Sequence, residues 1–288
     1  MAEQSAIEWT DHTFNPWEGC QKVGPGCDNC YAENRNARWN HGTAVNWGPG
    51  APRRRTSAAN WRKPLRWNAD AAAFAEVHGR KQRVFCASLA DVFDNAIHPG
   101  WRSDLFDLIY MTPNLDWLLL TKRIGNVAGM MQQLELEALP VNVWLGATVV
   151  NQQEADRDIP KLLATPAAVR FLSCEPLLGP VDLFKIERPY RQGYGHGYIE
   201  ALTGWTRSSG HGYREFDAAS AIDWIIVGGE SGPGARPMAN EWAQSIVDQC
   251  QRASVPVFVK QLSSGGAKAI KDLEQFPEGL RVREWPAT

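Results

Sequence analysis

Three cysteines lie close together near the start of the chain, within the segment from Asn15 to Glu33. Six residues separate Cys20 from Cys27, and two residues separate Cys27 from Cys30. The glycines between and around them allow the loop to wrap around a metal centre. Because Cys27 and Cys30 are three positions apart, a helix start or a tight turn places both sulfurs on one face, where the positive helix end favours thiolates.

Two kinds of metal centre suit three thiolates. Structural zinc is tetrahedral and needs a fourth ligand. The nearest candidates are His12, Asp28 and His41, none at a familiar zinc-finger spacing. A [4Fe–4S] cluster is held by cysteine thiolates, and three of them leave one iron open to a small-molecule ligand. The spacing favours the cluster, and zinc stays an alternative.

After these cysteines, short apolar or β-branched runs alternate with amphipathic stretches. The near-continuous hydrophobicity of the runs is typical of parallel strands covered on both faces. Strands are predicted over 7–10, 83–88, 117–121, 141–149, 169–174, 223–228 and 256–261. Helices are predicted over 69–78, 101–111, 124–136, 154–164 and 240–253, the last with Asn240 as its N-cap.

This alternation predicts an α/β fold in one domain, residues 1–288, that begins with the three-cysteine loop. Right-handed crossovers between six or seven β/α units curl such a sheet toward a partial (β/α)6-type TIM barrel. A flat doubly wound sheet is the alternative. In a barrel, functional side chains gather at the carboxyl ends of the strands.

The order of motifs resembles the radical S-adenosylmethionine (SAM) superfamily, in which a three-cysteine loop with an adjacent aromatic residue precedes β/α units. That superfamily usually has three and two residues between its cysteines, whereas this chain has six and two. From about Ile7 to Gln261, the chain resembles a phage-encoded three-cysteine-motif family of unknown function and is similar to the spore photoproduct lyase branch. The motifs are Asn15-Pro-Trp-Glu-Gly-Cys20, Cys27-Asp-Asn-Cys30-Tyr-Ala, Leu120-Thr-Lys-Arg123, Trp144-Leu-Gly-Ala-Thr148, Leu172-Ser-Cys-Glu-Pro176 and Val227-Gly-Gly-Glu-Ser-Gly232.

The resemblance implies that Cys20, Cys27 and Cys30 ligate a [4Fe–4S] cluster whose open iron binds SAM. The reduced cluster then cleaves SAM and yields a 5′-deoxyadenosyl radical. Tyr31, directly after the last ligand, is expected either to pack near the adenine or to be an ordinary core residue. An electron donor such as a flavodoxin or a ferredoxin is the expected partner.

Residues at the ends of predicted strands are candidates for holding SAM. Lys122 and Arg123 follow the strand 117–121, where a cation pairs with the SAM carboxylate, unless both are a surface pair that opens the next helix. Glu175 precedes a proline that stops its strand, so its carboxylate is expected to reach ribose hydroxyls or the SAM ammonium. Thr148 occupies an equivalent position.

Two further strand ends add candidates. Gly228, Gly229 and Glu230 form a glycine-rich turn in which backbone N–H groups can approach an anion closely. Cys174 ends the strand 169–174, and a thiol beside a radical site can donate a hydrogen atom, which makes Cys174 the catalytic candidate. The alternative for Cys174 is a small hydrophobic residue within a strand.

The segment 34–69 contains no acidic residue, although the protein has a net charge of −2. Its arginines and lysine are interleaved with tryptophans, a pattern typical of phosphate pairing and base stacking in nucleic-acid binding. A solvated basic run, with tryptophans that fill the base of the barrel, is the alternative. The residues predicted to contact nucleic acid are Arg53, Arg54, Arg55, Trp61, Arg62 and Lys63.

The stretch 187–220 is rich in glycine and tyrosine and is expected to be a lid or substrate-contacting insertion, or else a surface excursion.

Apolar residues make up 44% and charged residues 22%, as in globular enzymes. No apolar run is long enough to cross a membrane, and the N-terminal region lacks a signal-peptide pattern. A cytoplasmic protein with no membrane partner is therefore expected.

The sequence thus predicts a radical SAM enzyme that acts on a nucleic acid or a nucleotide and repairs or modifies a base, for example in DNA repair. One alternative is a zinc-stabilised nucleic-acid-binding accessory protein without catalysis. The other is a radical SAM enzyme that acts on a peptide or a small metabolite.

Overall fold

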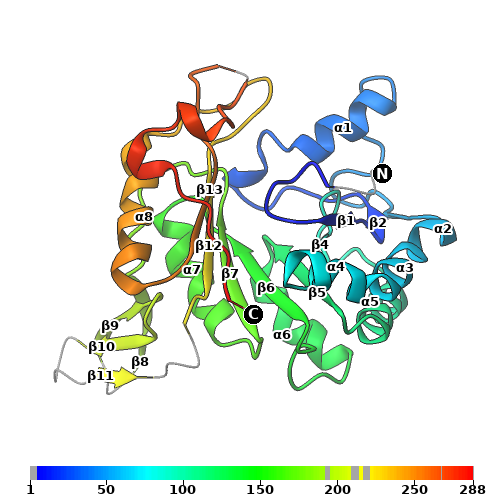
Figure 1. Ribbon diagram of the computed structural model, residues 1–288, viewed down its shortest axis with the longest axis horizontal. Helices are drawn as coiled ribbons and strands as arrows, with labels where there is room; N and C mark the ends of the chain where they lie inside the picture. Colours follow the sequence, from blue (N-terminus) through cyan, green and yellow to red (C-terminus); the bar gives the residue numbers. More distant parts are fainter. Residues whose placement is uncertain (1–4, 192–194, 209–213, 217–220, 267, 288) are drawn as a thin grey trace. The chain divides into compact units, whose positions relative to one another are not determined.

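The computed structural model describes residues 5–191, 195–208, 214–216, 221–266 and 268–287. They divide into two compact units, whose elements are labelled in Figure 1. The first unit covers the chain up to residue 146 together with 166–168, and the second covers 147–165 and the chain from 169 to 287.

Seven strands are hydrogen-bonded in the order β1-β4-β5-β6-β7-β12-β13. Their bounds are β1 (His12–Phe14), β4 (Gln82–Cys86), β5 (Leu115–Thr121), β6 (Val143–Thr148), β7 (Val169–Cys174), β12 (Trp224–Gly228) and β13 (Val257–Gln261). The pairs β1–β4, β4–β5, β7–β12 and β12–β13 are parallel. The predicted α/β class with parallel strands is confirmed. Because the order follows the chain without reversing, the topology differs from the doubly wound alternative.

In the first unit, every residue of β4 is buried, and in β5 only Leu120 is half-buried. The ring of Phe14 in β1 packs edge-on against Trp117 of β5, with ring centroids 5.6 Å apart. The short strands β2 (Trp17–Glu18) and β3 (Arg54–Arg55) pair antiparallel. The α-helices of this unit are α1 (Tyr31–Trp39), α2 (Ala58–Trp61), α3 (Lys63–Ala69), α4 (Ala71–His78), α5 (Pro99–Met111) and α6 (Ile124–Gln133).

The strand predicted over 7–10 is wrong. The N–H of Thr10 donates to the carbonyl of Ile7 at 3.2 Å and closes a turn, and the N–H of Ile7 donates to the hydroxyl of Ser5. These local hydrogen bonds take the place of hydrogen bonds to a neighbouring strand. Serine hydroxyls often compete with secondary structure in this way. The first strand therefore begins only at His12.

In the second unit, α8 (Asn240–Ala253) packs on β12 and β13 (Figure 1). The predicted bounds of α8 are confirmed, but the predicted cap is wrong, because Ala239 holds the N-cap position and Asn240 is the first helical residue. Helix α7 (Gln152–Leu163) begins two residues before its predicted start because Asn151 caps it: its side chain accepts from the N–H of Glu154 at 3.0 Å.

Part of the insertion is regular rather than the loop that the sequence predicts. Four strands pair antiparallel in the order β11-β10-β9-β8, namely β8 (Ile186–Arg191), β9 (Gly195–Glu200), β10 (Trp205–Ser208) and β11 (Arg214–Phe216). Of the glycines and tyrosines that suggested a loop, Gly193, Tyr194, Gly210, Gly212 and Tyr213 lie outside the described residues. Among the helices that the structure describes, none combines the length and the apolar run that a membrane crossing requires.

Candidate functional site

The cysteine loop of the first unit is fixed on both sides of Cys20. Gly19 has a φ of +110°, which favours glycine, and a Cβ there would lie 2.5 Å from the carbonyl oxygen of Asn46. The N–H of Gly48 donates to the carbonyl of Cys20 at 2.9 Å. The turn around residues 46–48 therefore lies directly against the backbone of the first cysteine.

The other two cysteines lie where a helix begins, as the spacing predicts. Cys27 ends a short 3-10 turn, and Cys30 is the N-cap residue of α1. Cys27 is buried, whereas Cys20 and Cys30 are half-buried, and all three are free thiols. The positive end of α1 stabilises negative charge near Cys30.

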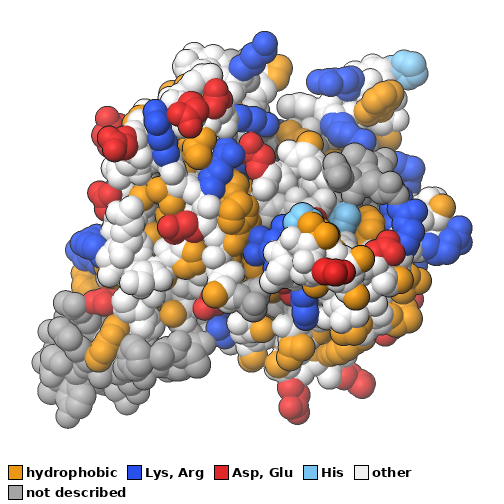
Figure 2. All heavy atoms as spheres, in the orientation of Figure 1, with side chains coloured by type: hydrophobic (Ala, Val, Ile, Leu, Met, Phe, Trp, Pro, Cys, Tyr) orange, Lys and Arg blue, Asp and Glu red, His pale blue; other side chains and the backbone are white. Residues whose placement is uncertain are grey.

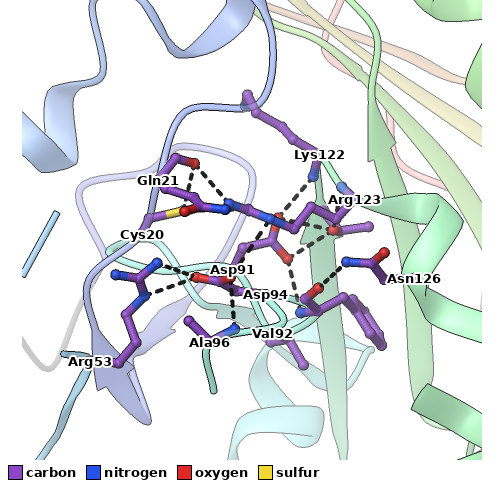
Figure 3. A network of polar contacts seen from close by, with 12 residues as sticks. Cys20, Gln21, Arg53, Asp91, Val92, Asp94, Ala96, Lys122, Arg123 and Asn126 are labelled. Carbon is purple, nitrogen blue, oxygen red and sulfur yellow. Dashed lines mark hydrogen bonds and ion pairs between the residues drawn. The ribbon is translucent and has the colours of Figure 1, made fainter. Parts of the chain in front are cut away.

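A buried arginine reaches the cysteine loop from the end of β5 (Figure 3). The guanidinium of Arg123 donates to the carbonyl of Gln21 at 2.8 Å and to Asp91 at 3.0 Å, and its Nη1 lies 3.4 Å from the sulfur of Cys20. Asp91 also accepts a bond from the hydroxyl of Thr121 at 2.8 Å. The loops after β4 and β5 are thereby tied to the first cysteine.

A second buried ion pair extends this network (Figure 3). Arg53 donates through Nε to Asp94 at 2.9 Å, and both side chains are 1% exposed. The same guanidinium donates to the carbonyl of Ala51 at 2.8 Å. Asp94 also lies 4.0 Å from Arg123. Two arginines and two aspartates thus balance their charges in the interior, which is the condition for tolerating buried ions.

Burial dominates the chemistry of the Cys20 thiol. It raises the pKa of Cys20 to about 11, against the opposing attraction of the Arg123 guanidinium. Metal ions bind thiolates, so a bound cation would have to displace this proton. The positive charge of Arg123 lowers the cost of that step.

The donor set fits a cysteine-ligated cluster in its chemistry: three thiols within one loop. Within the described residues, however, no group of three or more His, Cys, Asp or Glu side chains is already arranged around a common metal position. The zinc alternative needs a fourth ligand, and His12 is engaged elsewhere. Its ring stacks on Trp67 at 4.1 Å, and its Nε2 lies 2.6 Å from the side-chain oxygen of Gln82.

The remaining candidates of the first unit lie next to this network. The hydroxyl of Tyr31 donates to the carbonyl of Ser88 at 2.6 Å, while the residue stays 54% exposed. The backbone N–H of Lys122 donates to Asp91 at 3.1 Å, and its side chain is half-buried. Tyr31 is therefore not an ordinary core residue, and Lys122 and Arg123 do not form a simple surface pair.

Three candidates of the second unit, Glu175, Glu230 and Gly229, bond to other residues of that unit. Glu175 forms an ion pair with Lys260, and each side chain is 19% exposed. The carboxylate of Glu230 accepts two bonds from the Arg236 guanidinium. The N–H of Gly229 donates to a backbone carbonyl, that of Gln261, so this amide is not available to an anion. The roles of these residues toward SAM, like those of Gly228 and Thr148, stay predictions.

Cys174 lies in the core of the second unit. Its side chain is fully buried in β7, and burial raises the pKa of its thiol to about 12. The structure thus gives Cys174 the surroundings of a small hydrophobic residue, which was the alternative to hydrogen-atom donation.

The predicted nucleic-acid residues differ in how they are held. Arg53 is buried in the ion pair with Asp94 described above. Arg54 pairs with Glu18, and Arg55 pairs with Asp104 while lying over the ring of Trp61 at 4.3 Å. Lys63 is half-buried at the start of α3, and Arg62 is exposed. Three arginines of the run therefore have structural partners.

Two residues were missed at the cysteine loop. In the sequence, Asp94 is marked only by its place directly after the hydrophobic pair Val92-Phe93. Asn15 is 1% exposed and accepts from the N–H of Leu89 at 2.7 Å, which ties the start of the cysteine segment to the loop after β4. Only the tertiary structure identifies this partner, which lies 74 residues away in the chain.

Comparison with curated proteins gave no match, and neither did comparison with solved structures. A family model does match, over residues 4–282, and its description reads "Protein of unknown function". Because the match spans nearly the whole chain, this protein belongs to the family DUF5131.

Proposed function

We propose that this protein is a radical SAM enzyme in which Cys20, Cys27 and Cys30 ligate a [4Fe–4S] cluster, with SAM at the remaining iron. The observation that carries the proposal is the contact between Arg123 and the cysteine loop, 2.8 Å to the carbonyl of Gln21 and 3.4 Å to the sulfur of Cys20. A structural loop needs no buried guanidinium beside a thiol, whereas a thiolate ligand benefits from one.

When bound, the reduced cluster would supply the electron that cleaves SAM to methionine and a 5′-deoxyadenosyl radical. The chain's own residues position the reactants. Arg123 holds the backbone at Gln21, and the N-terminus of α1 stabilises the thiolate of Cys30. Tyr31 is fixed through its hydroxyl and offers an exposed ring for the adenine, and Lys122 offers a cation for the SAM carboxylate.

The proposed substrate is a base in nucleic acid, since the segment 34–69 is free of acidic residues. A flavodoxin or ferredoxin is the proposed electron donor.

We also infer that the seven-stranded sheet forms a partial (β/α)6-type barrel, because its strand order never reverses.

Metal analysis of protein purified without oxygen tests the proposal. About four irons and four sulfides per chain are expected, and Cys27→Ala should lose them. Cys250→Ala is the matched control, because Cys250 is a buried cysteine on α8, outside the loop. It should keep the full iron content. The loaded protein with a chemical reductant should then release 5′-deoxyadenosine from SAM.

Colourless protein with one zinc per chain would overturn the proposal and favour the zinc-stabilised accessory protein. A peptide or small-metabolite substrate would be favoured instead by SAM cleavage in a protein that does not bind nucleic acid.

A further inference from the structure

A pocket of about 440 Å³ lies beside α1 in the first unit. It is lined by one face of α1, by the turn at residues 45–46 and by the paired strands β2 and β3. Arg35 and Trp39 both line it, and because they are four residues apart on α1 they lie on the same helix face. A cation and an aromatic ring therefore share one wall of the pocket.

Trp39 is 75% exposed, more than any other tryptophan among the exposed large hydrophobic residues of the described chain. An indole carries one of the largest apolar surfaces of any side chain, and leaving it in water forgoes its burial. Tryptophans elsewhere in this unit, such as Trp17 and Trp67, are buried in the core. The exposed ring at the pocket is thus a surface that a planar ligand can cover.

The charge around the ring is positive. Within the described residues, Arg35 has no ion-pair partner and is exposed. Arg54, which also lines the pocket, pairs with Glu18 yet stays 62% exposed. Figure 2 shows Lys and Arg side chains gathered over α1 and α2, with hydrophobic side chains between them. This combination complements a polyanion that also presents flat rings.

Hydrogen bonds within the segment hold the walls in place. The side-chain oxygen of Asn36 accepts from the N–H of Val45 at 2.9 Å, and the amide nitrogen of Asn46 donates to the carbonyl of Pro52 at 2.9 Å. A pocket fixed in this way loses little conformational entropy when a ligand enters it.

We propose that this pocket binds single-stranded nucleic acid, with one base stacked on Trp39 and the neighbouring phosphates paired with Arg35 and Arg54. Single strands present unstacked base faces, whereas a duplex hides them, so a single strand fits an exposed indole better. Substrate capture by this pocket presupposes the function proposed above. Oligonucleotide binding itself can be measured without iron or SAM.

The test is fluorescence anisotropy with a labelled single-stranded oligonucleotide of about 12 nucleotides, over a range of salt concentrations. Trp39→Ala should weaken binding roughly 5- to 150-fold, and Trp39→Phe should restore much of it, because stacking needs a ring. Arg35→Ala should reduce the steepness of the plot of log binding constant against log salt concentration by about 0.7. Arg35→Lys should leave this slope unchanged, because the positive charge is kept. Tyr110→Ala is the matched control, since Tyr110 is an aromatic residue that is 55% exposed on α5, outside the pocket.

Equal binding by Trp39→Ala and the unmodified protein would overturn the proposal, as would a duplex of the same sequence that binds as tightly as the single strand. A larger loss in Arg62→Ala than in Arg35→Ala would also overturn it and move the contact to α2 and α3. Binding at Trp39 in a protein that never cleaves SAM would leave the pocket standing and remove the proposed enzyme. SAM cleavage without oligonucleotide binding would leave the proposed enzyme standing and overturn the proposed pocket.

Discussion

The guanidinium of Arg123 donates to the carbonyl of Gln21 at 2.8 Å and so joins the second residue after β5 to the cysteine loop, 102 residues earlier in the chain. The same group is 7% exposed and pairs with Asp91, which is equally buried. A loop that carries three cysteines and five nearby glycines and prolines would otherwise sample many conformations, at a large entropic cost to any ligand that needs one of them. The buried arginine restricts those conformations at the first cysteine.

Replacing Arg123 by Ala should lower the free energy of unfolding by about 3–5 kcal/mol, because the carboxylate of Asp91 is left buried without its partner. Hydrogen exchange at residues 19–23 should become faster. Urea unfolding and exchange mass spectrometry measure the two effects. Arg157→Ala is the control: that side chain is 50% exposed, and Lys161 still pairs with Asp158. The free energy of unfolding of Arg157→Ala should fall by less than about 1 kcal/mol. An equal loss in both variants would contradict the role of Arg123.

Gly19→Ala should destabilise the protein more than Gly42→Ala does. Both glycines have positive φ, +110° and +93°, so both variants carry backbone strain of about 1–2 kcal/mol. Only at Gly19 would the new Cβ also clash, 2.5 Å from the carbonyl oxygen of Asn46, whereas nothing lies within 4 Å at Gly42. Thermal and urea unfolding of the pair isolates the clash. Identical losses would mean that the turn at 46–48 is not packed against Cys20.

Acid should lower the free energy of unfolding through protonation of Asp11. Burial alone would raise the pKa of Asp11, but bonds from Arg80 at 2.7 and 2.9 Å and from the N–H of Arg83 at 2.8 Å outweigh it and lower the pKa. A carboxyl with a lowered folded pKa stabilises the protein above its unfolded pKa, near 4, and this contribution is lost as the pH falls through the folded pKa.

The Asp11→Asn variant should therefore lose about 1–3 kcal/mol at pH 7, and the difference from the unmodified protein should narrow as the pH falls from about 5 to 2. Urea unfolding at several pH values measures this. Glu274→Gln serves as the control, because that side chain is 84% exposed and should show a difference near zero throughout. A difference for Asp11→Asn that does not change with pH would contradict the assignment.

Thiol labelling of metal-free protein should divide five of the six cysteines into two classes. Cys20 and Cys30 are half-buried and should react with a small alkylating reagent in the folded state, Cys30 first, because burial raises the pKa of Cys20 to about 11. Cys86, Cys174 and Cys250 are fully buried and should react only after unfolding. Peptide mass spectrometry gives the order, and labelling in urea is the control for complete reaction. Rapid labelling of Cys174 in the folded protein would favour its predicted role as a hydrogen-atom donor.

Most strands of the seven-stranded sheet, though not β1, and several helices could be predicted from the sequence, because their signal is local. The run 169–174 is mostly apolar, and the prediction matches β7 to the residue. The bounds of α8 follow in the same way from the spacing of its apolar residues. The turn at 7–10 was not predicted, because a hydrogen bond to the hydroxyl of Ser5 overrides the local pattern. The strands at 186–216 were not predicted either, because they depend on antiparallel pairing with one another.

What the sequence by itself determined is the chemistry on offer: three thiols in one glycine-rich loop, a cation after a strand and a basic segment without acids. What only the tertiary structure decided is which of these groups meet. Arg123 lies beside Cys20, Arg53 is buried against Asp94, and Trp39 is left exposed at a pocket. The reason is physical: a charge is buried only where chain folding brings it a partner, and partners dozens of residues apart leave no mark on local spacing.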